Sequence, residues 1–312
     1  MNNNVSLVGV PSDMGASDRG ASMGPEALRV AGILETLKKQ GINVTDKGDV
    51  RGPANPEQPP ENGYRHLKEI TEWSENIRNA IYNELNAGKL PIMMGGDHAM
   101  SIGSVAAIAK YCSEIGKPIC ILWIDAHADY NTNVTSPSGN IHGMPVAVAT
   151  GNGHPDLLAI GHAIPMVAPE NVYQIAIRSV DENEKKLVIE SGINVYDMRR
   201  IDEIGIRQTM QEILHDVAIK GAHLHVSFDV DSLDPSIAPG VATTIPGGLT
   251  YREAQLCMEM IHDSGLMGSL DIAEINPALD TKNSTAEIAV DLTASLFGRQ
   301  IFPTHSLYQG EY

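Results

Sequence analysis

Three short segments of the sequence are rich in residue types that bind metal ions. Residues 95–98 read Gly-Gly-Asp-His, residues 125–129 read Asp-Ala-His-Ala-Asp, and residues 229–231 read Asp-Val-Asp. In an extended chain, residues two positions apart lie on the same side, so Asp125, His127 and Asp129 would face one way, and Asp229 and Asp231 would share a side in the same manner. The candidate ligands are His98, Asp125, His127, Asp129, Asp229 and Asp231. We expect Asp97 to hold the loop around His98 and not to be a ligand.

These six residues would supply four carboxylates and two imidazoles. Four carboxylates in one place repel one another unless cations neutralise them. Two divalent ions would do so. A donor set rich in oxygen, without thiolate, suits two Mn²⁺ per subunit, although Co²⁺, Fe²⁺ or Zn²⁺ could occupy the same site. Two such ions can deprotonate a shared water at neutral pH. Each motif alone can be ordinary loop chemistry, but three together predict a two-metal hydrolytic centre.

Short apolar runs precede these motifs and predict the strands that position them. The runs are residues 5–10, 90–94, 119–124, 172–177, 194–196, 223–228 and 269–275. Near-continuous apolar runs are typical of a sheet that is buried on both faces. Helices are expected between the runs, over residues 24–41, 74–86, 101–114, 250–265 and 284–298, with capping boxes beginning at Thr250 and Ser284. This alternation predicts an α/β fold with a parallel sheet, and polar residues at the strand ends would form the site.

No linker divides the chain. Residues 52–63 are rich in proline, but we interpret them as a long surface loop, so residues 1–312 are predicted to form one domain. Twenty-two Lys and Arg against 39 Asp and Glu give a net charge of −17. Such a chain is an unfavourable partner for nucleic acid or an anionic membrane, and a small cationic or neutral molecule suits it better. The three cysteines form no CxxC pair, which favours reduced thiols in a cytoplasm.

With these motifs in view, the chain resembles the arginases of the ureohydrolase superfamily. The similarity runs from the Val-Gly-Val-Pro at residues 8–11 to about Phe297 and includes all three metal motifs. The resemblance implies a three-layer α-β-α fold around a mostly parallel sheet of about eight strands, and a homotrimer or homohexamer. It assigns one ion to His98, Asp125, Asp129 and Asp229, and the other to Asp125, His127, Asp229 and Asp231.

The polar segment 131–143 follows the predicted ligand Asp129, so it must line the site. In the arginase pattern its residues Asn131, Ser138 and Asn140 bind the α-carboxylate of arginine. His142 matches the histidine that moves protons, a task that suits imidazole because its pKa is near neutrality. Asp129 would pass a proton to the leaving amino group.

Four further residues at strand ends or in loops match the arginase pattern. Asp181 would meet the substrate α-amino group, with Glu184 nearby, although the same spacing is typical of a helix N-cap followed by an acid. Glu274 would pair with the guanidinium, since a carboxylate can orient this planar cation through two hydrogen bonds. Thr243 matches a loop threonine of the family. Its neighbours Ala242 and Thr244 replace the family's Gly and Pro, so this loop is expected to differ.

The resemblance therefore implies hydrolysis of L-arginine to L-ornithine and urea by a hydroxide that bridges the two metals. The main alternative is a ureohydrolase of agmatine or guanidinobutyrate. A metal amidohydrolase of the deacetylase type and a catalytically silent relative are weaker alternatives. His223 and His225 lie deeper in the strand that leads to Asp229, so they are expected to be structural or to support the ligands from behind. The remaining histidines are expected to have surface or loop roles: His66, His154, His162, His215, His262 and His305.

Overall fold

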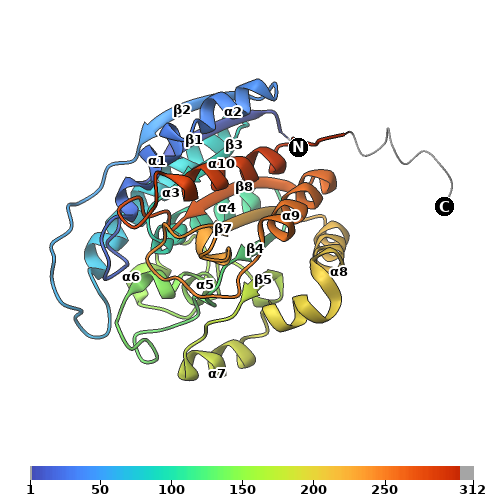
Figure 1. Ribbon diagram of the computed structural model, residues 1–312. Helices are drawn as coiled ribbons and strands as arrows, with labels where there is room; N and C mark the ends of the chain where they lie inside the picture. The colour runs from blue at the N-terminus through green and yellow to red at the C-terminus, as the bar shows by residue number, and fades with distance from the viewer. Residues whose placement is uncertain (1, 303–312) are drawn as a thin grey trace.

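The computed structural model describes residues 2–302, in which one parallel sheet separates two layers of helices (Figure 1). The strands are β1 (Asn4–Gly9), β2 (Asn43–Asp49), β3 (Leu90–Met94), β4 (Ile119–Ile124), β5 (Val172–Ile177), β6 (Asn194–Asp197), β7 (His223–Asp229) and β8 (Met267–Ala273). Their order is β2-β1-β3-β8-β7-β4-β5-β6, and every neighbouring pair is parallel. The predicted three-layer α/β fold is confirmed.

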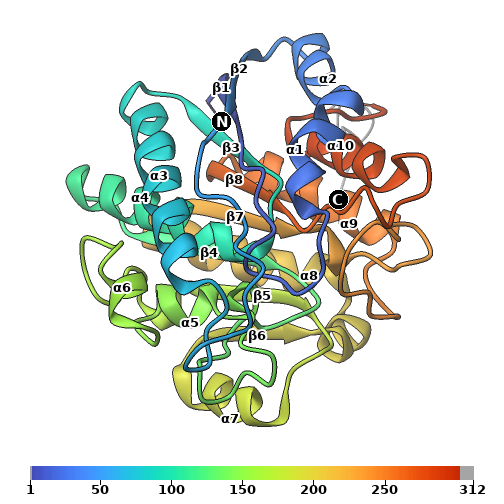
Figure 2. The same ribbon diagram turned by 90° about the vertical axis from the view of Figure 1, so that its left-hand side faces the viewer.

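Helices cover both faces of the sheet (Figure 2). The helices are α1 (Gly24–Val30), α2 (Ile33–Lys39), α3 (Leu67–Asn86), α4 (Ser101–Glu114), α5 (Pro145–Ala149), α6 (Pro155–Leu158), α7 (Glu182–Ser191), α8 (Met198–Lys220), α9 (Tyr251–Ser264) and α10 (Ser284–Leu296). Helices α1, α2, α8, α9 and α10 share one hydrophobic core with the sheet, and α3 to α6 share the other. Among residues 2–302, no helix is long and apolar enough to cross a membrane.

Alternate residues of a central strand face opposite cores, which explains why the strands read as continuous apolar runs. In β4, Cys120 and Leu122 belong to the core beneath α8 and α9, whereas Ile121 and Trp123 belong to the core beneath α3 and α4. All six residues of this strand are buried. Both faces of the strand therefore require apolar side chains.

The structure differs from the sequence-based expectations at several polar elements. Strand β2 was not predicted because its sequence, NVTDKGD, is polar and mostly exposed at the sheet edge. The expected helix over residues 24–41 is two helices, because Gly32 adopts a φ of 84° between them. Helix α3 begins earlier than residue 74. The capping box at Thr250 is confirmed, but the one at Ser284 is wrong, because Asn283 is the N-cap and its side chain makes no capping bond.

Four adjacent central strands, β3, β8, β7 and β4, end at one edge of the sheet. His98, Asp125 and Asp229 lie at or just after the ends of β3, β4 and β7, and Glu274 directly follows β8. The fold thus brings residues from distant parts of the sequence to one place, at the carboxyl edge where sites form in such sheets.

Candidate active site

The turn after β3 directs His98 into the sheet edge. Gly95 and Gly96 both have positive φ, and a Cβ on Gly95 would lie 2.4 Å from the ring of Pro25. Only glycine accommodates this backbone without strain. Asp97 then caps the following turn, since its carboxylate accepts hydrogen bonds from the backbone N–H groups of Ala99 and Gly15 at 2.9 Å each. The structure places Asp97 in the predicted loop-holding position.

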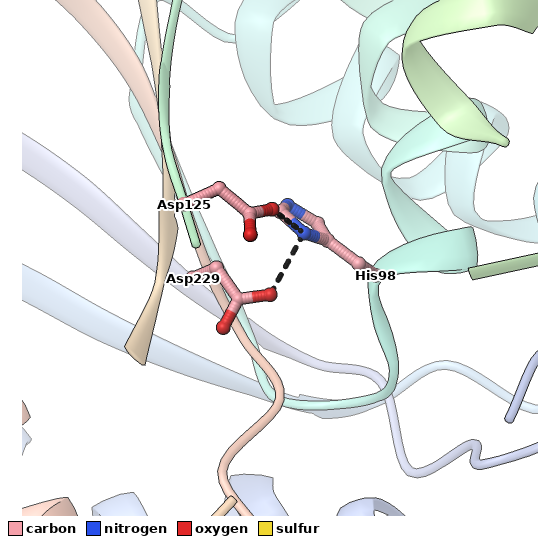
Figure 3. Close-up of side chains that lie close together, drawn as sticks. All are labelled: His98, Asp125 and Asp229. Atoms are coloured by element: carbon pink, nitrogen blue, oxygen red, sulfur yellow. Dashed lines mark ion pairs between the residues drawn. The ribbon is translucent and has the colours of Figure 1, made fainter. Parts of the chain in front are cut away.

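His98 faces three carboxylates with one ring nitrogen, and Figure 3 shows two of them, those of Asp125 and Asp229. Its Nδ1 lies 3.0 Å from Asp125 Oδ2, 3.0 Å from Asp229 Oδ2 and 3.2 Å from Asp129 Oδ2. Donor atoms of His98, Asp125 and Asp229 all lie within 4.8 Å of one another, close enough to share one ion.

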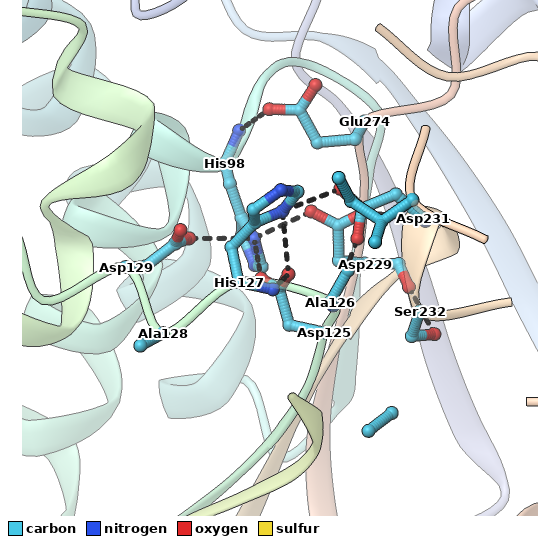
Figure 4. Close-up of polar contacts among 12 residues, drawn as sticks. His98, Asp125, Ala126, His127, Ala128, Asp129, Asp229, Asp231, Ser232 and Glu274 are labelled. Atoms are coloured by element: carbon cyan, nitrogen blue, oxygen red, sulfur yellow. Dashed lines mark hydrogen bonds and ion pairs between the residues drawn. The ribbon is translucent and has the colours of Figure 1, made fainter. Parts of the chain in front are cut away.

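A second group adjoins the first (Figure 4). His127 Nδ1 lies 3.0 Å from Asp231 Oδ2 and 3.5 Å from Asp125 Oδ1. Donor atoms of Asp125, His127 and Asp231 also lie within 4.8 Å of one another, so Asp125 belongs to both groups. All six predicted ligands are therefore together.

Turns, as well as strand alternation, bring the six residues together. Asp231 lies in a short 3-10 turn after β7, and Asp129 has a φ of 50°. The expectation that each motif stays extended is wrong for these two residues. The expectation that the acids of each motif converge is nevertheless met, because the turns redirect the chain at the strand ends.

Burial makes this carboxylate cluster unstable without cations. Burial raises the pKa of Asp229 well above its usual value, and the charges of Asp231 and Asp125 raise it further. Burial and the charge of Asp125 raise the pKa of Asp129 to about 6. For Asp125, hydrogen bonds with His127 and His98 outweigh burial and lower the pKa. Because one nitrogen of His98 lies within 3.2 Å of three buried carboxylate oxygens, the donor set fits divalent ions.

Two residues that the sequence reasoning did not select support the ligands from behind. Trp123 Nε1 donates to Asp125 Oδ2 at 2.9 Å, and the indole stacks on His98 with ring centroids 4.0 Å apart. Ser227 Oγ lies 2.8 Å from His98 Nε2. Each precedes a ligand by two positions on a strand, so the alternation rule could have identified both.

Glu274 joins the six candidate metal ligands, called the metal group from here on, to His142. Its Oε1 accepts hydrogen bonds from the backbone N–H of His98 at 2.8 Å and from His142 Nδ1 at 2.9 Å. Although burial opposes a charged imidazole, the carboxylate of Glu274 raises the pKa of His142 to about 9. Burial likewise opposes the charged form of Glu274, but His142 and the His98 N–H lower its pKa. The pair is therefore an ion pair at neutral pH.

One pocket joins the metal group to every predicted substrate residue. Its lining includes the predicted residues His98, His127, Asp129, Asn131, Ser138, Asn140, His142, Asp181, Glu184, Asp229, Asp231, Thr243 and Glu274. The sequence reasoning missed four other lining residues, Ser136, Pro137, Gly143 and Ser179. Three of these four lie within the segment that was predicted to line the site.

Asp181 and Glu184 confirm the helix-capping interpretation of their spacing, and their contact with a substrate remains a prediction. They form a capping box at the start of α7 and also line the pocket. Glu184 Oε1 accepts from the Tyr130 N–H at 2.8 Å, and Asp181 Oδ2 accepts from Asn131 Nδ2 at 3.0 Å. Burial and the charge of Asp129 raise the pKa of Glu184 to about 7.

The loop around Thr243 is held to the metal group by Arg178. Its guanidinium donates to the Ile245 carbonyl at 2.8 Å and to the Asp231 carbonyl at 2.8 Å. Arg178 was not selected from the sequence, because nothing in its spacing indicates that its donors meet backbone carbonyls of two distant loops. Thr243 lines the pocket despite its altered neighbours.

Most of the other histidines follow the predictions. His223 and His225 are buried on β7 and both bond Ser269 Oγ, as expected for structural residues. His66 lies in the loop before α3, as expected, but it is buried, with its ring nitrogens 3.0 Å from the carbonyls of Met14 and Gln58. His305 lies outside the described residues.

This chain combines an all-parallel α/β sheet with two adjoining His–Asp groups at the carboxyl edge of that sheet. The arrangement is that of a dinuclear metal enzyme. The Arginase family model matches residues 3–298. The arginase of Bacillus caldovelox is 43% identical to this chain over 301 residues, which cover 95% of this chain and 99% of that relative. The arginase of Agrobacterium fabrum (strain C58) is 44% identical over 301 residues, which cover 95% of this chain and 91% of that relative. The solved structure of the B. caldovelox arginase matches with a TM-score of 0.91 and 41% identity, covering 96% of this chain and 99% of that one. The chain belongs to the arginase family.

Proposed function

We propose that this enzyme hydrolyses L-arginine to L-ornithine and urea. The observation that carries the proposal is the pocket, whose lining combines members of both His–Asp groups with the acidic residues Asp181 and Glu184 and with hydroxyl and amide side chains. Asp181 and Glu184 would receive the α-amino group, and Asn131, Ser138 and Asn140 the α-carboxylate. Thr243 would contact the substrate from the third loop.

The six ligands would hold two divalent ions per subunit. His98, Asp125, Asp129 and Asp229 would bind one ion, and Asp125, His127, Asp229 and Asp231 would bind the other. Their oxygen-rich donor set favours Mn²⁺, and Co²⁺, Fe²⁺ or Zn²⁺ could take the same positions. When bound, the ions would lower the pKa of a shared water so that hydroxide is available at neutral pH.

Protein side chains would orient the substrate and move the protons. Oε1 of Glu274 already accepts two hydrogen bonds, so Oε2 is the atom that would pair with the guanidinium. Asp129 would accept a proton from the hydroxide and deliver it to the leaving amino group. His142, whose side chain is 21% exposed, would exchange protons between the pocket and solvent.

Urea release distinguishes this function from its main alternative. The Mn²⁺-loaded protein would be assayed with L-arginine, agmatine and guanidinobutyrate under identical conditions. We expect the highest kcat/KM with L-arginine, because only this substrate carries both an α-amino group and an α-carboxylate. A preference for agmatine would contradict the substrate assignment and leave the hydrolytic chemistry intact. Repeating the assay with Co²⁺, Fe²⁺ and Zn²⁺ would test the metal assignment.

We also propose that residues 1–312 act as one domain, that the enzyme is a homotrimer or homohexamer, and that it works in the cytoplasm on a small molecule. The family resemblance supports the assembly. The three cysteines support the location, since all are buried free thiols, as expected in a reducing compartment. The net charge of −17 supports a cationic small molecule over nucleic acid or a membrane surface.

A further inference from the structure

The proline-rich loop between β2 and α3 is tied down at the edge of the substrate pocket. It is the long blue connection at the left of Figure 1. Most of its residues are exposed, yet Trp73 Nε1 donates to the Pro53 carbonyl at 3.0 Å. The buried ring of His66 lies 3.0 Å from the Gln58 carbonyl, which anchors the other end. The loop is therefore held in one position although it contains no helix or strand of its own.

The end of this loop packs directly on the substrate segment 131–143. The backbone N–H of Arg65 donates to the Gly139 carbonyl at 2.8 Å, and Tyr64 Oη donates to Asn133 Oδ1 at 3.2 Å. A Cβ on Gly63 would lie 2.4 Å from the Asn133 carbonyl oxygen, so the two backbones are in close contact. Any shift of one loop must move the other.

The side chain of Arg65 fixes the orientation of Asn140. Arg65 Nε donates to Asn140 Oδ1 at 2.8 Å, and Ser17 Oγ donates to the same oxygen at 2.9 Å. A guanidinium has donors and no acceptor, so the amide atom that faces it must be the oxygen. The amide NH₂ of Asn140 is left for the pocket, and within residues 2–302 no protein atom accepts a hydrogen bond from it.

Like Asn140, Ser138 has a hydrogen-bond donor available to the pocket. Its Oγ accepts the backbone N–H of Asn140 at 3.2 Å, so the hydroxyl proton remains available to a ligand. Two of the three predicted carboxylate-binding side chains, Ser138 and Asn140, therefore present donors, whereas the amide of the third, Asn131, donates to Asp181. Asp181 and Glu184 in the same pocket differ in this respect, because their carboxylates present hydrogen-bond acceptors.

Arg65 also brings a positive charge that no described carboxylate neutralises. Its guanidinium makes no ion pair within residues 2–302, and its second contact is NH1 with the Gln58 carbonyl at 3.5 Å. By contrast, Arg19 and Arg29 each pair with acidic side chains. A partly buried cation next to donor groups favours binding of an anion.

We propose that Arg65 is a specificity-determining and positioning residue for substrates that carry an α-carboxylate. It holds the Asn140 amide with its NH₂ group toward the pocket, and it adds positive charge at the end where the carboxylate would lie. The inference rests on the proposed function, because it assigns the Ser138–Asn140 corner to that group. Ser17 is the second positioning residue, since it donates to the same amide oxygen.

The test uses substitutions that separate the hydrogen bond from the charge. Arg65→Met removes both, Arg65→Gln keeps an N–H donor without charge, and Ser17→Ala removes the second donor. We expect Arg65→Met to raise the KM for L-arginine about tenfold with kcat little changed, equivalent to about 1.4 kcal/mol of binding. Arg65→Gln should give a smaller increase. Both donors hold the same oxygen. The double variant Ser17→Ala/Arg65→Met should therefore raise the KM for L-arginine by more than the product of the two single increases.

The control is Arg199→Gln, because Arg199 is exposed on α8 and its ion pair within residues 2–302 is with Glu203. It should leave KM and metal content unchanged. The binding of L-ornithine and of putrescine, which lacks the carboxylate, is measured for each variant independently of turnover. Arg65→Met should weaken ornithine binding about tenfold and leave putrescine binding unchanged.

The outcomes separate the two levels of inference. Equal losses for ornithine and putrescine, or no loss for either, would overturn the role of Arg65. If wild-type enzyme prefers agmatine while Arg65→Met selectively weakens ornithine binding, the proposed substrate fails and the role of Arg65 stands.

Discussion

The two ends of the active-site pocket are built differently. At the metal end, His98, Asp125 and Asp229 lie at the ends of adjacent strands whose backbones are fixed by the parallel sheet. At the substrate end, Asn140 and Asp181 belong to connections that hold one another through side-chain hydrogen bonds. The rigid end defines the reaction, and the loops define which molecule reaches it. Substitutions should therefore fall into two kinds.

The largest effect is expected from Asp125→Ala. Asp125 belongs to both metal groups and accepts a hydrogen bond from Trp123, so its loss should release metal and lower kcat about a thousandfold. Metal content by mass spectrometry and urea release measure the two effects. Asp202→Ala, which removes an exposed acid on α8, is the matched control and should change neither. Full metal content in Asp125→Ala would refute the ligand assignment.

An intermediate effect is expected at the boundary between the two ends, where His142 pairs with Glu274. The pKa of His142 is raised to about 9 in the folded chain, against 6.5 ordinarily. Its protonation therefore stabilises the fold fully below about pH 6.5, and this contribution is lost as the pH rises through about 9. In metal-free protein, the difference in unfolding free energy between wild type and His142→Asn should shrink by about 2 kcal/mol over this range. Urea denaturation of both proteins at several pH values measures this difference. A difference that stays constant with pH would contradict the ion pair.

The smallest effect is expected from Ser138→Ala at the substrate end. Losing one hydroxyl donor to a charged group should raise the KM for L-arginine about tenfold. Metal content and kcat should stay near wild type, because Ser138 contacts none of the ligands in the described structure. Agmatine turnover serves as the internal control. If Ser138→Ala also lost metal, the division between the two ends would be wrong.

The same division explains how much could be predicted from the sequence. The ligands could be found because metal-binding residue types at strand ends are visible in the residue pattern, although turns at Asp129 and Asp231 interrupt the alternation. Trp123 and Ser227 precede ligands by two positions on a strand, so the alternation rule could have identified them. Arg65 and Ser17 obey no such rule, because their shared contact with Asn140 joins three segments far apart in the chain. Arg178 is a similar case, since its partners are backbone carbonyls that carry no sequence signal.

Strand β2 was missed for its polarity, and that polarity has a consequence for how copies of the protein meet. An open sheet edge offers free backbone groups that can template a strand from another molecule. At this edge, Asp46 and Asp49 pair with Arg29, and Lys47 pairs with Glu84. Adding a strand there would bring a second backbone against these charged groups. The edge therefore resists strand exchange and fibrillar growth when the protein is crowded.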